Sequence, residues 1–249
     1  MTTAHGDARM PVMKAANLLT NQIDYYRARA GEYDEWWFRT GRYDRGAEFN
    51  GQWHAETAAV EAALESWLAA RRRADVLELA CGTGLFTRRI APRVARLTAV
   101  DASPEVIAIN RGRVDAANVE YVEADLFAWR PTCRYDAVIF TFWLSHVPEE
   151  RFAAFWNMVA DALAPGGAAY LIDSAFDPTS TAKDHALPGR DAGVVTRKLN
   201  DGREFRIVKV FYDPPTLAAR VEALGWRADL AQTARYFIYG EATPPVRVG

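Results

Sequence analysis

Short apolar runs alternate with segments of helical periodicity from residue 75 onward. The apolar runs predict strands at 76–79, 96–100, 120–124, 135–140 and 168–173, then a β-rich segment at 205–212 and a last strand at 232–240. Helices are expected between them at 85–91, 104–115, 149–163 and 214–224. The run at 135–140 is predominantly apolar, which is typical of a central parallel strand. This alternation predicts an α/β fold with helices on both faces of a mostly parallel sheet.

Residues 15–70 follow a different pattern, helical in character and unusually rich in aromatic side chains. Glycines divide this stretch into short pieces, and a last helix is expected at about 52–72, with its apolar stripe packed in the core. We expect residues 1–72 to form an N-terminal tail and an aromatic helical lid. Residues 73–249 should form the remaining core, interrupted at about 177–204 by a mobile insertion rich in Pro, Gly, Asp and Lys.

Polar groups and glycines stand where three successive strands are expected to end. The first strand contains Glu78 and runs into a glycine turn at Gly82 and Gly84, while Asp101 and Asp125 close the next two strands. Such a turn brings backbone N–H groups close to a ligand with no β-carbons in the way. The carboxyl ends of neighbouring strands are where open α/β sheets bind ligands. The sequence therefore predicts one ligand-binding rim.

As a set, these residues resemble the class I S-adenosylmethionine-dependent methyltransferases of the small-molecule kind, related to ubiquinone and menaquinone C-methylases and antibiotic-tailoring enzymes. The resemblance runs from about residue 73 to the C-terminus, and more loosely through the N-terminal helices. It includes an acid four residues before the first turn glycine, although Ala80 stands where the family usually has glycine. The resemblance implies a Rossmann-like seven-stranded sheet with an antiparallel last strand, and S-adenosylmethionine as cofactor.

Two other functions are compatible with a glycine turn after a strand. A nicotinamide-dependent oxidoreductase needs a small third residue in its G-x-G-x-x-G fingerprint. Here that position is Thr87, or Leu85 if the count starts at Ala80, and neither is small. A non-catalytic module that binds S-adenosylmethionine without turning it over stays open.

The resemblance and the residue chemistry together imply a cofactor site. Asp101, with Ala102 beside it, suits the ribose diol, because a carboxylate accepts two hydroxyl hydrogen bonds at once. The adenine would lie at Asp125, with Leu126 and Phe127 around the ring. The methionine end and the methyl would be held by the lid, the first strand, the glycine turn and the end of the central strand: Tyr33, Trp37, Glu78, Ala80, Cys81, Gly82, Gly84, Thr141 and Phe142.

The methyl acceptor is expected to be an O, N or C nucleophile of a small aromatic or heteroaromatic metabolite, near Trp36, Trp143 and His146. His146 follows the central strand and titrates near neutrality, so it is the candidate general base when the acceptor atom starts out protonated. The alternatives are that His146 orients its loop or caps the next helix, and that Trp143 is ordinary core.

Composition narrows the class of partner. The formal net charge of the 249 residues is −2, which gives no electrostatic reason to expect nucleic acid. No apolar run approaches the roughly 20 residues of a membrane-spanning helix. The two cysteines, Cys81 and Cys133, predict neither a disulfide nor a metal site. We therefore expect a cytoplasmic enzyme that acts on a small molecule, with a homodimer left open.

Overall fold

The computed structural model describes residues 12–71 and 74–245, so the predicted tail before residue 12 and residues 72–73 lie outside the described part. Its main sheet has seven strands in the order β3-β2-β1-β4-β5-β9-β8. The first five in that order are parallel, and β9 runs antiparallel to both β5 and β8. The strands are β1 (Asp75–Leu79), β2 (Arg96–Asp101), β3 (Val119–Glu123), β4 (Tyr135–Thr141), β5 (Leu163–Ser174), β8 (Arg227–Gln232) and β9 (Phe237–Thr243). The predicted fold class is confirmed.

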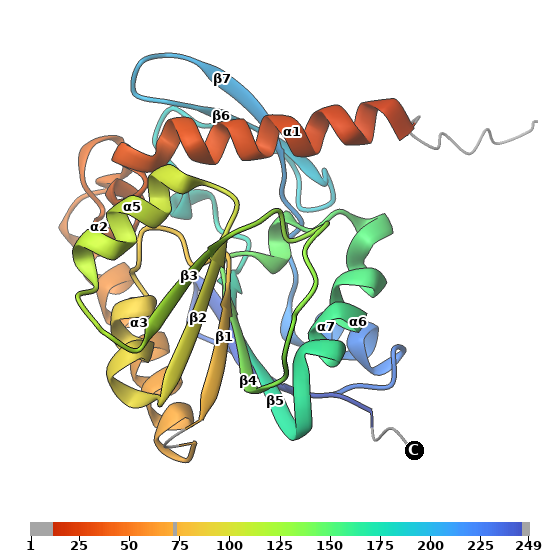
Figure 1. Ribbon diagram of the computed structural model, residues 1–249. Helices are drawn as coiled ribbons and strands as arrows, with labels where there is room; N and C mark the ends of the chain where they lie inside the picture. The colour runs from red at the N-terminus through yellow and green to blue at the C-terminus, as the bar shows by residue number, and fades with distance from the viewer. Residues whose placement is uncertain (1–11, 72–73, 246–249) are drawn as a thin grey trace, which may run out of the picture.

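Helices cover both faces of this sheet because successive side chains of a strand point to opposite faces. In β4, Ala137 and Ile139 pack in the core on one face, and Val138 and Phe140 in the core on the other. In Figure 1, α3 (Ala47–Ala69) and α5 (Pro104–Arg113) lie on the left of the sheet, with α6 (Phe152–Ala162) and α7 (Pro214–Glu222) on the right. Within the described ranges, no helix is both long and apolar enough to span a membrane.

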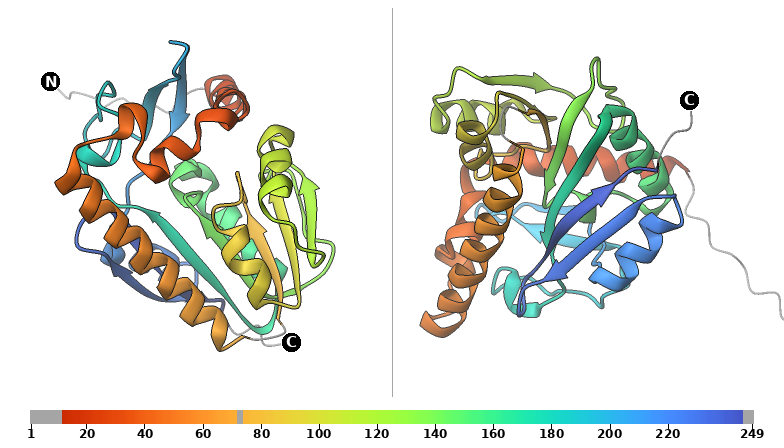
Figure 2. Two further views of the ribbon diagram at one scale, coloured as in Figure 1. Left: turned by 90° about the vertical axis from the view of Figure 1, so that its left-hand side faces the viewer. Right: turned by 90° about the horizontal axis from the view of Figure 1, so that it is seen from below.

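The N-terminal segment lies across one end of the sheet. It consists of α1 (Val12–Arg29), η1 (Ala30–Glu32), α2 (Asp34–Phe38) and η2 (Gly41–Tyr43). A separate hairpin of β6 (Val194–Lys198) and β7 (Glu204–Val208) packs against α1, and the same arrangement is visible from a second side in Figure 2. The segment at 177–204 thus contains η6 (Pro178–Ser180) and β6.

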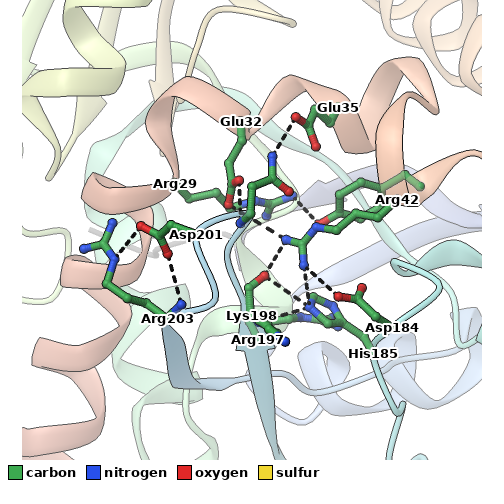
Figure 3. A network of polar contacts seen from close by, with 12 residues as sticks. Arg29, Glu32, Glu35, Arg42, Asp184, His185, Arg197, Lys198, Asp201 and Arg203 are labelled. Atoms are coloured by element: carbon green, nitrogen blue, oxygen red, sulfur yellow. Dashed lines mark hydrogen bonds and ion pairs between the residues drawn. The ribbon is translucent and has the colours of Figure 1, made fainter.

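A polar network joins the N-terminal segment to the hairpin (Figure 3). Arg42 of η2 donates to the backbone carbonyl of Lys198 and lies 3.4 Å from Asp184 and 3.8 Å from Glu32. From β6, the amide of Lys198 donates to Nε2 of His185 over 3.0 Å. The pKa of His185 is lowered to about 4 by burial and by Arg197 and Arg42, so this ring is neutral near pH 7. The N-terminal segment and the β6–β7 hairpin, which are far apart in sequence, therefore lie together over one end of the sheet. We call these two parts the roof.

Several predicted elements were wrong in extent. The helix expected at 85–91 begins at Thr87 and lasts one α-turn in α4 (Thr87–Ile90), because the glycine turn occupies the residues before it. The strand expected at 232–240 is really the β8–β9 hairpin, whose edge strand β8 is mostly exposed and carries too little apolar pattern to be recognised. The strand expected at 168–173 begins earlier, at Leu163 in β5, and its register with β4 shifts near that start. The β-rich segment at 205–212 ends as a strand at Val208.

Candidate active site

The turn after β1 is fixed in position by hydrogen bonds to Asp101 at the end of β2. Ala80 and Gly82 both take left-handed backbone conformations, with φ of 55° and 52°. The amide of Gly82 donates to Oδ2 of Asp101 over 2.9 Å, and the amide of Ser103 donates to Oδ1 over 3.0 Å. The left-handed conformation explains why glycine suits position 80, and why the smallest side chain replaces it here. The carboxylate of Asp101 thus fixes the turn to the start of α5.

Glu78 is buried beneath this turn. One of its carboxylate oxygens accepts from Oγ1 of Thr87 over 2.8 Å, and the other has no partner among the described residues. Burial raises the pKa of Glu78 to about 8. A buried carboxyl with a free oxygen can pair with a cationic group of a ligand, which would restore its charge.

A largely apolar pocket opens between this turn and α1. The ends of β2, β3 and β4 contribute to its lining, so Asp101 and Asp125 lie on the same cavity. Asp125 is exposed and accepts from the amide of Phe127 over 2.9 Å. The lining residues are Leu19, Gln22, Ile23, Tyr26, Tyr33, Ala80, Gly82, Asp101, Ala102, Ser103, Val106, Asp125, Leu126, Phe127, Thr141, Phe142, Trp143 and His146. We call this cavity the first pocket.

A second pocket adjoins the first and has a different chemistry. Its lining is rich in cations and hydroxyl groups and contains no Asp or Glu: Tyr26, Arg29, Tyr33, Trp36, Tyr43, Phe142, His146, Ser174, Ser180, Thr181, Arg197, Ile207, Lys209 and Phe211. Four residues line both pockets: Tyr26, Tyr33, Phe142 and His146. We call these four the shared wall.

Three cations face the second pocket from three elements of the roof. Arg29, at the end of α1, donates to the hydroxyl of Tyr43 over 3.1 Å, and Arg197 of β6 donates to Oγ1 of Thr181 over 2.7 Å. Lys209, just after β7, is 6% exposed and donates to Oγ of Ser145 over 2.8 Å.

The Lys209 ammonium has one carboxylate close by. It lies 3.7 Å from Asp173, a buried residue whose oxygens also accept from the amides of Ser145 and Ser174. Burial lowers the pKa of Lys209 to about 8, with Arg197 acting in the same direction and Asp173 against it. Among the described residues, neither Arg29 nor Arg197 forms an ion pair with a carboxylate.

His146 uses both of its ring nitrogens within the protein. Nδ1 lies 2.7 Å from the carbonyl oxygen of Val208, which can only accept, so Nδ1 carries a proton. Nε2 lies 2.8 Å from the hydroxyl of Tyr26. Burial, and then Lys209, hold the pKa of His146 well below its usual value. The ring is therefore neutral near pH 7, and its Nε2 accepts from Tyr26.

Most of the predicted site residues lie on these two pockets. Trp36 lines the second pocket and donates its indole N–H to the carbonyl of Ser180 over 3.2 Å, whereas Trp143 lines the first. The indole nitrogen of Trp143 is buried without a partner among the described residues. The predicted site residues outside both linings are Trp37, Glu78, Cys81 and Gly84. Of these, Trp37 is packed in the core beside Phe86 and Phe142, and the thiol pKa of Cys81 is raised by burial.

The residues of the second pocket that sequence reasoning missed include its polar and charged members Tyr26, Arg29, Arg197 and Lys209. The spacing of Gln22, Tyr26 and Arg29 places them on one face of a helix, and this polar and aromatic face was the available signal. No comparable pattern marks Arg197 or Lys209, because the β6–β7 hairpin brings them to the site from a segment without a motif.

Comparison with known proteins agrees with this geometry. Residues 76–167 match the family model described as "Methyltransferase domain". The chain is 34% identical to the cypemycin N-terminal methyltransferase of a Streptomyces species over 187 residues, 69% of this chain and 74% of the relative. It is 33% identical to the ubiquinone biosynthesis O-methyltransferase of Xylella fastidiosa (strain 9a5c) over 168 residues, 66% of this chain and 65% of the relative.

Solved structures extend the match over nearly the whole chain. A complex of DhpI with SAH has a TM-score of 0.74 and 40% sequence identity, covering 93% of this chain and 99% of DhpI. The DhpI-SAM-HEP complex has a TM-score of 0.73 at the same identity, covering 98% and 100%. The cofactor of this protein is accordingly S-adenosylmethionine. The glycine turn, the strand-end carboxylates and these relatives lead to one conclusion, that the chain belongs to the class I S-adenosylmethionine-dependent methyltransferases.

Proposed function

We propose that this methyltransferase transfers a methyl group to an oxygen of a small organic acid bound in the second pocket. The observation that carries this proposal is the convergence of Arg29, Arg197 and Lys209 on a pocket with no carboxylate in its lining. Arg29 is buried, and neither it nor Arg197 has a carboxylate partner among the described residues, so a bound anion would compensate their charge. Lysine and arginine side chains are also the usual partners of carboxylate and phosphate oxygens.

The first pocket suits the cofactor. Asp101 and Asp125 offer acceptors for hydroxyl and amino groups, while Leu126 and Phe127 supply apolar surface for a ring. The unpartnered oxygen of Glu78 lies beneath the turn and is suited to the ammonium of the methionine end. These residues fit S-adenosylmethionine, which when bound supplies a methyl group on a positively charged sulfur.

The chain's own residues would do the rest by alignment and exclusion of water. The cations hold the acid so that one oxygen faces the shared wall. That oxygen forms the new C–O bond, and the electrons of the broken C–S bond stay on sulfur. An oxyanion carries no proton on the attacking atom, so no general base is required. This agrees with the engagement of both ring nitrogens of His146.

The finer predictions about the acceptor and its partners remain open. An aromatic or heteroaromatic ring stays a prediction, supported by the rings of Trp36 and Phe211 in the second pocket. Attack by nitrogen or carbon is the alternative to attack by oxygen. A homodimer, a cytoplasmic location and the absence of a nucleic-acid partner also stay predictions.

Transfer of radioactive methyl from S-adenosylmethionine tests the proposal. Benzoate and phenylphosphonate are the anionic probes, and phenol is the neutral probe of similar ring size. We expect label in the acids and none in phenol. Labelling of phenol alone would contradict an anionic acceptor. If none of the probes became labelled, the result would favour the non-catalytic binding module.

A charge variant makes this test specific to the second pocket. Lys209→Met should raise the KM of the acid about tenfold or more, as expected when a charge-assisted hydrogen bond is lost. The matched control is Lys183→Met, which removes an exposed lysine outside both pockets. Affinity for S-adenosylhomocysteine should stay within about twofold of wild type in both variants, since Lys209 does not line the first pocket.

A further inference from the structure

The shared wall contains a tyrosine whose hydroxyl is oriented by the protein itself. Tyr26 comes from α1 and lines both pockets, so it lies where a methyl group must pass from one to the other. This placement rests on the proposed function, in which the first pocket holds the cofactor and the second the acceptor.

The direction of the hydrogen bonds fixes what the Tyr26 oxygen can do. The Nδ1–H of His146 donates to the carbonyl of Val208, so Nε2 is an acceptor and the Tyr26 hydroxyl donates to it. The hydroxyl proton is thus committed to His146. The phenolic oxygen keeps its lone pairs and meets any bound ligand as an acceptor only.

Neighbouring charges maintain this orientation. Arg29 at the end of α1, Arg197 on β6 and Lys209 after β7 all act against protonation of the buried His146 ring. A protonated ring would donate from both nitrogens and reverse the Tyr26 hydrogen bond. The three cations that would attract an acid into the second pocket therefore also keep His146 neutral.

We propose that Tyr26 is a catalytic residue whose oxygen accepts from the polarised C–H groups of the cofactor's sulfonium methyl, and that His146 is the positioning residue that aims it. C–H groups next to a positive charge donate weakly to oxygen. An oxygen with free lone pairs at the shared wall would orient the methyl and favour the partial positive charge it carries during transfer.

Binding of cofactor analogues tests this assignment without any acceptor. Sinefungin carries an amine-bearing carbon in place of the methylated sulfur, so its ammonium is a strong donor at the methyl position. S-Adenosylhomocysteine has no group there. By calorimetry, Tyr26→Phe should weaken sinefungin binding about tenfold or more, as for loss of a charged hydrogen bond, and leave S-adenosylhomocysteine binding within about twofold. Equal losses for both ligands, or no loss for sinefungin, would overturn the proposal.

Tyr25→Phe is the matched control. Tyr25 precedes Tyr26 on the same helix, but it lines neither pocket, and its buried hydroxyl has no partner among the described residues. The same substitution there removes a hydroxyl from the same part of α1 and should leave both affinities unchanged. A sinefungin defect of equal size in Tyr25→Phe would assign the effect to packing of α1 and contradict the role of Tyr26.

The role of His146 is tested through Tyr26. His146→Leu removes the acceptor for the hydroxyl proton, so it should reproduce the selective loss of sinefungin affinity. His146→Gln retains a carboxamide oxygen that can accept from Tyr26, and should recover most of that affinity. If His146→Leu kept the wild-type ratio of the affinities for sinefungin and S-adenosylhomocysteine, His146 would have no positioning role. These binding measurements need no methyl acceptor. They can therefore refute the role of Tyr26 while acids are still methylated, and they can support it even if the methyl acceptor is not an acid.

Discussion

The pKa values of single side chains in this protein are shifted by charged groups that other elements place beside them. Lys209 is the clearest case, because its neighbours within reach are Asp173, Arg197, Arg29 and two serine hydroxyls. Its pKa of about 8 lies well below the ordinary lysine value, so its positive charge is lost within an experimentally accessible range.

Under the proposed function, this tuning predicts a pH dependence for the methylation of an acid. A lysine is charged below its pKa, so kcat/KM for benzoate, which is ionised throughout this range, should be constant up to about pH 8 and decline above it. Lys209→Arg, whose guanidinium stays protonated, should abolish the decline. Initial rates from pH 6.5 to 9.5 provide the measurement, and an identical decline in Lys209→Arg would assign it to another group.

The two glycines of the turn, Gly82 and Gly84, differ in the space that a side chain would find there. A β-carbon on Gly84 would lie 2.5 Å from Oδ1 of Asn110, whereas one on Gly82 meets nothing within 4 Å. The Asn110 side chain cannot move away cheaply, because it donates to Thr87 and to two backbone carbonyls and accepts from Tyr121. Both glycines have positive φ, so this strain is shared and the contact makes the difference.

Gly84→Ala should therefore cost about 1–3 kcal/mol more unfolding free energy than Gly82→Ala, as for other overpacked sites. Urea denaturation of the two variants gives the comparison. Gly82→Ala serves as the internal control for backbone strain, and equal losses in the two variants would refute the crowding argument.

Whole elements are joined at the site by a few contacts between the N-terminal segment and the sheet. Asp34, the first residue of α2, accepts from Oγ1 of Thr83 in the glycine turn over 2.6 Å and pairs with Arg113 of α5. This contact joins the N-terminal segment to the turn that contributes to the first pocket. The pair is partly exposed, so its contribution should be modest.

Asp34→Asn should weaken S-adenosylhomocysteine binding about two- to fivefold, in line with a partly exposed ion pair of up to about 1 kcal/mol. Asp75→Asn is the control, because it breaks the Arg96 pair at the opposite end of β1 and β2. Calorimetry on both variants decides the matter. A defect of similar size in Asp75→Asn would show that general destabilisation, not the contact between Asp34 and the turn, is responsible.

The element scale also shows where sequence reasoning succeeded. The strand ends at Asp101 and Asp125 were predictable, because apolar runs mark parallel strands and their carboxyl ends meet at one edge. The edge strand β8 was not, because its pattern is too polar. The second pocket was not predictable either, since Arg197 and Lys209 reach it only through tertiary packing of the β6–β7 hairpin on α1.

At the scale of the whole molecule, α1 lies over both pockets and would be in contact with any ligand in them. Leu19, Gln22, Ile23 and Tyr26 of this helix line the first pocket. Ligand binding should therefore stabilise the fold globally and α1 locally. A ligand that binds only the folded state raises the unfolding free energy of the entire chain by mass action.

S-Adenosylhomocysteine at about 100 times its Kd should add about 2.7 kcal/mol of stability. For a chain of this size, that corresponds to an increase in Tm of roughly 5–10 °C. Hydrogen exchange should slow in α1 more than in α6, which lines neither pocket and is the internal reference. Uniform protection of both helices would show that ligand binding does not involve α1 specifically.

The carboxylate-free lining of the second pocket bears on how turnover ends. Under the proposed function, esterification neutralises one negative charge on the bound acid, so the attraction that drew it toward Arg29, Arg197 and Lys209 weakens once the reaction is complete. The ester is then held less tightly than the acid it came from. Product departure is thereby favoured over retention, and a second methylation of the same molecule is disfavoured.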